Sequence, residues 1–252
     1  PNRGLPSGRD LDGDGQVGGA NDAEGYGAFA GQGGLAVLSR LPIASEAVRD
    51  FTAFAWADLP SHTAPEDGRN PTRLSTTAHW DVPVILPGGQ ALHLLVWHAT
   101  APVFDGPEDR NGRRNHDEAA FWLAYLDGKL SQTPPERFVL LGVANADPND
   151  GDSRPGALRQ LLSVAQDTRP SSEGAALAGI DPTQSGPPAL DTVDWDDGPK
   201  RPGNLRVDYV LPAKSLTVTD SGVFWPAAEH PLAETVATAS RHRLVWVDIE
   251  LP

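Results

Sequence analysis

The chain has 252 residues, a length typical of one large domain or two small ones. Its formal net charge of −14 disfavours binding of nucleic acid through many phosphate contacts, and the lack of cysteine excludes disulfides and thiolate metal sites. No apolar run reaches the roughly 20 residues that a membrane-spanning helix needs, so we expect no membrane span.

The N-terminal half begins with segment 1–33, which is rich in Gly, Asp and Asn and is expected to form an ordered loop. Short apolar runs predict a buried strand at 34–39 and a weaker strand at 51–56. Segments 81–86 and 91–98 flank a Pro-Gly-Gly turn and predict a hairpin. The two-residue period of a strand places the histidine that ends this hairpin where side chains commonly project into a site.

The C-terminal half interleaves helices with strands. The strongest predicted helix spans 115–129, with Asn115 as its N-cap and two acidic residues in its first turn. The other predicted elements are a strand at 137–143, a helix at 153–164, a long polar segment at 166–202, and strands at 205–211, 216–225 and 242–251. With no internal repeat and no linker, the pattern favours one mixed α/β sandwich domain over residues 1–252.

Segment 1–33 contains an acidic motif that we interpret as a calcium loop. Its sequence Asp10-Leu-Asp12-Gly-Asp14-Gly matches the pattern D-x-D-x-D-G, in which alternate carboxylates on a tight turn converge on one point. A hard cation with six to eight oxygen ligands relieves their mutual repulsion. The expected ligands of this structural Ca²⁺ are Asp10, Asp12, Asp14, the backbone carbonyl of Gln16, and Asp22. The alternative is a solvated acidic turn.

Three strings, PVFDGPEDRNGRRNHDE, NADPNDGDS and PGNLRVDYVLP, resemble the endonuclease/exonuclease/phosphatase superfamily, and more closely a bacterial exported branch of it. The resemblance spans about residues 1–250. It implies an α+β fold, the four-layer α/β/β/α sandwich of the DNase I-like class, whose strand ends form a divalent-metal phosphoesterase site. Together with the acidic, cysteine-free composition, it favours an extracellular or periplasmic protein.

The resemblance also implies roles for four residues. His98 would contact the phosphoryl oxygens, and Asn145 would hold the phosphate or the nucleophilic water. Asp208 would orient His242, which would be the general base or the stabiliser of developing charge, because a carboxylate fixes the tautomer of an imidazole and supports its protonated form. The implied cofactor is Mg²⁺ or Mn²⁺, and the implied substrate is a small phosphoester. Without the resemblance, each of these residues has an ordinary interpretation as a hydrogen-bonded histidine or a turn cap.

The sequence departs from the family pattern at the metal side of this site. Val143 and Arg241 stand where the family has aspartates. A divalent ion about 4 Å from a guanidinium would be repelled by roughly 8 kcal/mol at an effective dielectric of 20. The family's first strands, which bear an asparagine and a metal-binding glutamate, would precede residue 1. We therefore expect a sheet edge that is covered either by a protein partner or by an upstream segment of the chain.

Two hypotheses about function follow from these patterns. The first is a metal-dependent phosphoester hydrolase by descent, with a degenerate metal site. The alternative is a catalytically inactive, calcium-stabilised scaffold or subunit that binds another protein.

Overall fold

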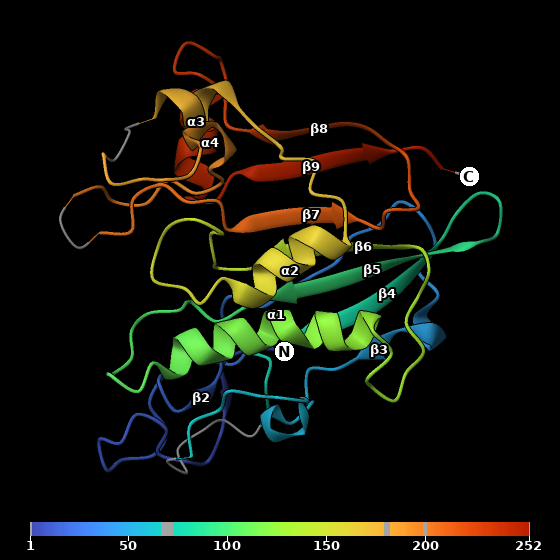
Figure 1. Cartoon of the computed structure of the whole chain (residues 1–252). Helices are drawn as coiled ribbons and strands as arrows, with labels where there is room; N and C mark the ends of the chain where they lie inside the picture. The colour runs from blue at the N-terminus through green and yellow to red at the C-terminus, as the bar shows by residue number, and fades with distance from the viewer. Residues whose placement is uncertain (1, 67–72, 179–181, 199–200, 252) are drawn as a thin grey trace.

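The computed structural model describes residues 2–66, 73–178, 182–198 and 201–251 (Figure 1). The strands are β1 (Leu5–Pro6), β2 (Ala23–Glu24), β3 (Arg49–Asp50), β4 (His79–Ile85), β5 (Ala91–His98), β6 (Phe138–Val143), β7 (Asp208–Pro212), β8 (Val218–Phe224) and β9 (Leu244–Ile249). The α-helices are α1 (Arg110–Leu126), α2 (Gly156–Val164), α3 (Glu173–Leu177) and α4 (Ala233–Ala239). Among the described residues, no helix combines the length and the apolar character that crossing a membrane requires.

Five strands form the larger sheet in the order β3-β4-β5-β6-β7, and β8 pairs with β9 in a separate two-stranded sheet. The β4–β5 hairpin confirms the one predicted from the sequence. Strands β5 and β6 run parallel with α1 as their crossover, whereas β6 and β7 are antiparallel. In Figure 1, α1 and α2 lie in front of the larger sheet, and α3 and α4 lie together near one end of β8 and β9.

Alternation along the strands gives the larger sheet two apolar faces. Leu95 and Trp97 point toward α1, where they share the main core with Trp122. The opposite face presents Leu92, and Ile249 of β9 packs against the cluster that contains it. The order helix, sheet, sheet is that of the predicted α/β sandwich.

Helix α1 starts at Arg110, so the predicted N-cap at Asn115 is wrong. Asn115 lies inside the helix and is buried, and its Nδ2 donates to the carbonyl oxygens of Thr100 and Ala144, at 2.7 Å each. Glu118 is also buried and accepts the backbone N–H of Thr100 at 2.5 Å. Helix α1 therefore holds the two loops that follow β5 and β6.

Two predicted strands in the N-terminal half are wrong. Segment 34–39 forms no strand with the described residues and is not buried; Leu38 is 95% exposed, and the side chain of Asn2 binds both the N–H and the carbonyl oxygen of Leu35. Segment 51–56 turns back on itself at Phe54, so its aromatic residues reach the core from a turn. The apolar run at 51–56 correctly indicated burial, whereas the one at 34–39 did not, and neither run says what satisfies the backbone.

The remaining predictions differ from the structure mainly at element ends. Residues 2–33 form an ordered loop that also contains the short β1–β2 ribbon, and residue 1 lies outside the described residues. The last three predicted strands correspond to β7, β8 and β9, each of them shorter than predicted. The polar segment 166–202 contains the short helix α3, which the sequence did not predict; its residues 179–181 and 199–200 lie outside the described residues.

Candidate active site

At the ends of β5, β6 and β7, three side chains point to the sheet face that is turned away from α1. In the strand register, His98 of β5 lies opposite Val143 of β6, and Val143 lies opposite Asp208 of β7. Neighbouring strands are about 4.8 Å apart, so His98 and Asp208 flank Val143 at a backbone separation of about 10 Å. The topology therefore gathers residues from distant parts of the sequence at one edge.

Asp208 forms an ion pair with His242. The Nδ1 atom of His242 lies 3.0 Å from both carboxylate oxygens of Asp208. Thr192 fixes this carboxylate, because its Oγ1 donates to Asp208 Oδ2 at 2.7 Å. A backbone bridge between Val193 and His242 brings the histidine to the end of β7. The hydrogen bond to Asp208 raises the pKa of His242 above its ordinary value, although partial burial acts the other way.

His98 has the opposite electrostatic environment. Burial lowers the pKa of His98 to about 4, and the positive charges of Arg3 and His242 act in the same direction. His98 is therefore neutral near pH 7 and is able to donate a hydrogen bond from one ring nitrogen and accept one at the other. Two imidazoles with pKa values shifted apart in this way suit different roles in one site.

Asn145 begins the loop that follows β6. Its backbone is left-handed, with φ of 49°, and its Nδ2 donates to the carbonyl oxygen of Ala99 at 2.8 Å. This bond ties the β6 loop to the residue that follows His98. Asn145 therefore links the segments that follow β5 and β6.

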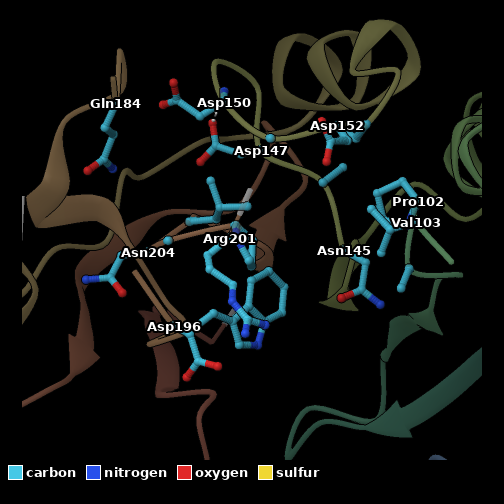
Figure 2. Close-up of a pocket in the computed structure, with 18 of the residues that line it drawn as sticks. Pro102, Val103, Asn145, Asp147, Asp150, Asp152, Gln184, Asp196, Arg201 and Asn204 are labelled. Carbon is cyan, nitrogen blue, oxygen red and sulfur yellow. Dashed lines mark hydrogen bonds between the residues drawn. The ribbon is translucent and has the colours of Figure 1, made fainter. Parts of the chain in front are cut away.

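A pocket of about 790 Å³ adjoins these residues (Figure 2). Asn145 and Arg241 line it, and so does Trp195, whose ring meets the ring of His242 edge to face at 6.0 Å between centroids. The pocket therefore lies next to the Asp208–His242 pair.

The residues around the pair do not fit a catalytic divalent ion. Of the groups described, Asp10, Asp12 and Asp22 form the one cluster of three ligating side chains, and that cluster lies in the N-terminal loop. Val143 offers no ligand atom, and Arg241 brings a cation, paired with Asp196 at 3.0 Å. Magnesium keeps several of its waters but still needs one or two carboxylates to hold it, and Asp208 is already engaged by His242 and Thr192.

The acidic loop brings together three of its five predicted ligands. One oxygen from each of Asp10, Asp12 and Asp22 lies within 4.8 Å of the others, and the backbone N–H of Leu11 holds the pKa of Asp22 below its ordinary value. Asp14 is outside this cluster, and its carboxylate accepts the N–H of the exposed Gln16 at 2.7 Å. Three convergent carboxylates fit a hard, oxygen-preferring cation such as Ca²⁺.

Sequence reasoning missed several residues of the site. Thr192 and Trp195 lie in the irregular segment before β7, and Arg3 and Phe104 lie in loops without periodicity. No residue pattern gave any of them a role in the site, although Phe104 lies within the first of the three family-like strings. His79 of β4 lies outside this site and has a packing role, because the residue is 1% exposed and bonds to Ser75 Oγ and the carbonyl oxygen of Glu118.

Comparisons with known proteins identify the family and the fold of the chain. The family model described as "Endonuclease/Exonuclease/phosphatase family" matches residues 4–242. A solved structure of an endonuclease/exonuclease/phosphatase from Beutenbergia cavernae DSM 12333 is 17% identical, with a TM-score of 0.50, over 84% of this chain and 46% of that chain. Sphingomyelinase C from Streptomyces griseocarneus is 16% identical, with a TM-score of 0.34, over 84% of this chain and 62% of its own.

This chain therefore spans less than half of the Beutenbergia protein. The comparison with curated proteins found no match. The family model nevertheless covers most of the chain, and the solved structure has the same fold. The protein belongs to the endonuclease/exonuclease/phosphatase family.

Proposed function

We propose that the chain is a phosphoester hydrolase by descent whose metal site is degenerate. The main support is that His98 and the Asp208–His242 pair lie at the same edge of the larger sheet, on either side of Val143, beside a pocket large enough for a small substrate. Separated elements of the chain supply these residues, and no packing requirement alone explains their convergence.

The geometry supports an acid–base role for His242. Its Nδ1 faces the carboxylate of Asp208, which leaves Nε2 as the atom that takes a proton from the attacking water. Asp208 then stabilises the imidazolium that forms. His98, neutral at the end of β5, would donate a hydrogen bond to a phosphoryl oxygen, and Asn145 would keep the two loops at a fixed spacing.

Val143 and Arg241 support the degenerate part of the proposal. Val143 occupies the register position between His98 and Asp208, where a carboxylate would face the substrate phosphorus and any bound cation. Arg241 precedes His242 directly and lines the pocket. Both features weaken divalent-ion binding, so we expect slow turnover of phosphoesters by this chain.

The test is the hydrolysis of bis(4-nitrophenyl) phosphate at pH 7.5 with Mg²⁺, with Mn²⁺, and with a chelator. The double variant Val143→Asp with Arg241→Asp should gain at least tenfold in metal-dependent rate, equivalent to about 1.4 kcal/mol of transition-state free energy. The matched control, Val143→Asn with Arg241→Asn, removes the same groups without adding charge and should gain little. His242→Ala should abolish the residual rate.

Two results would contradict the proposal. If the unaltered chain turns over rapidly with Mg²⁺ and the double aspartate variant adds nothing, the site is not degenerate. If residual hydrolysis survives His242→Ala at the same rate, the pair is not the site of the reaction.

We also propose a structural Ca²⁺ at Asp10, Asp12 and Asp22, which is supported by their convergence within 4.8 Å. A second candidate function uses this ion in a non-catalytic subunit that binds another protein. The replaced residues Val143 and Arg241 favour this candidate, and so does the incompletely buried apolar face around Leu94 and Val210. Absence of turnover in every arm of the rate assay, together with a stable complex in light scattering, would favour the subunit over the enzyme.

A further inference from the structure

The pocket beside His242 has two walls that come from different loops. Pro102 and Val103 lie on one side, and Asp196 and Arg201 lie on the other (Figure 2). Its volume of about 790 Å³ is in the range of sites for small organic ligands, which is about 300–1,000 Å³. The substrate is therefore expected to have a sizeable group besides its phosphate.

Phe104 extends the first wall, and both its solvent-exposed ring and its backbone conformation are energetically unfavourable. Its side chain is 94% exposed, and its φ of 68° lies in the left-handed region that bulky residues rarely adopt. Asn111 of α1 fixes both flanks of Phe104: its Nδ2 donates to the carbonyl oxygen of Val103 at 2.7 Å, and its N–H donates to the carboxylate of Asp105 at 2.5 Å. Strain of this kind persists where the surrounding structure enforces it, often at functional sites.

Trp195 continues the second wall and connects it to the reacting pair. Its ring contacts that of His242, as described above. The preceding residue, Asp194, is fixed at both ends, because its N–H donates to the carbonyl oxygen of Arg241 at 3.0 Å and its carboxylate pairs with Arg243 at 2.7 Å. A ligand that touches Trp195 therefore lies next to the imidazole of His242.

Two of the acidic residues in the lining have structural partners. Asp147 accepts the N–H of Asn149 at 2.7 Å, and Asp150 accepts the N–H of Gly186 at 2.7 Å. These carboxylates hold turns in place. The lining also includes the apolar surface of Leu205, in addition to the two aromatic rings.

We propose that this pocket takes a planar aromatic group of the substrate, stacked on Phe104 and Trp195, with the attached phosphate at His242. The substrate class is then a small phosphoester of an aryl or nucleobase-bearing alcohol. The phosphoester part rests on the proposed function, whereas binding of the aromatic group requires no turnover. Stacking on aromatic side chains accepts any flat ring, so both sources of the ring share one chemistry.

The test measures binding by calorimetry with three probes: phenylphosphonate, cyclohexylphosphonate and adenosine 5′-phosphate. Phenylphosphonate should bind at least about fivefold more tightly than its saturated analogue, because only the planar ring stacks. Phe104→Ala should remove this preference without unfolding the protein, because the ring is exposed. Phe29→Ala is the matched control, since Phe29 is an exposed phenylalanine that does not line the pocket.

Equal binding of the phenyl and cyclohexyl probes would overturn the proposal, and so would a ring preference that survives Phe104→Ala. Tighter binding of adenosine 5′-phosphate than of phenylphosphonate identifies the ring as a nucleobase, and the reverse order identifies a simple aryl group. Ring-selective binding without hydrolysis in any arm would refute the proposed function and leave this inference standing. Hydrolysis that depends on His242 but shows no ring preference would refute this inference and leave the proposed function standing.

Discussion

His98 should make the protein sensitive to acid. Its pKa of about 4 in the folded chain lies below the ordinary value of 6.5, so the unfolded chain binds this proton more readily. The stabilisation is therefore fully present above pH 6.5 and is lost as the pH falls toward 4. The difference between the two pKa values corresponds to about 3.5 kcal/mol at about 1.4 kcal/mol per pH unit, as an upper figure for a side chain that is not fully buried.

Urea unfolding at pH 7.5 and at pH 4.5 measures this loss. We expect the unaltered chain to lose about 2–3 kcal/mol more than His98→Gln over this range. His62→Gln, at an exposed histidine, is the control and should follow the unaltered chain. An NMR titration assigns the effect, because the His98 imidazole should remain neutral at pH 5.5. A midpoint at or above 6.5 for His98 would refute the reasoning on burial and neighbouring charge.

Three further predictions concern the rest of the molecule. Asp208→Asn should lower the pKa of His242, because the hydrogen bond to the carboxylate raises it, and should reduce any turnover by about a hundredfold or more; an unchanged imidazole titration would contradict this role. A calcium chelator should speed proteolysis of the acidic loop in the unaltered chain but not in Asp12→Asn, and equal cleavage with and without the chelator would argue against the ion. Gly142→Ala should destabilise the fold by about 2 kcal/mol or more in thermal unfolding, because the new Cβ would lie 1.9 Å from the carbonyl oxygen of Trp97. A free energy of unfolding within about 0.5 kcal/mol of the unaltered chain, roughly the scatter of neutral surface changes, would show that β6 shifts to make room for the methyl group.

The sequence predicted the elements whose signals are local. The β4–β5 hairpin follows from alternating apolar residues on either side of a Pro-Gly-Gly turn, and α2 follows from its leucine spacing. The start of α1 could not be predicted, because the polar residues of its first turns are buried by loops far away in the sequence. Asn115 is one example, since its partners at Thr100 and Ala144 come from two different loops.

The candidate site shows the same limit. The resemblance named His98, Asp208 and His242, and the structure brings them to neighbouring strand ends. Thr192 and Trp195, which hold and contact the pair, belong to an irregular segment in which neither spacing nor residue type indicates a role. Their positions depend on tertiary contacts that no local pattern records.

The amide of Asn115 has a consequence for how the protein tolerates change. This one side chain on α1 binds the segments that follow β5 and β6. The spacing between the ends of these two strands, at the candidate site, is therefore set from the opposite side of the sheet. Any replacement that tilts or slides the helix would move both segments together. Engineering of this protein for new chemistry should therefore keep the two hydrogen bonds of Asn115 and vary the outer loops instead.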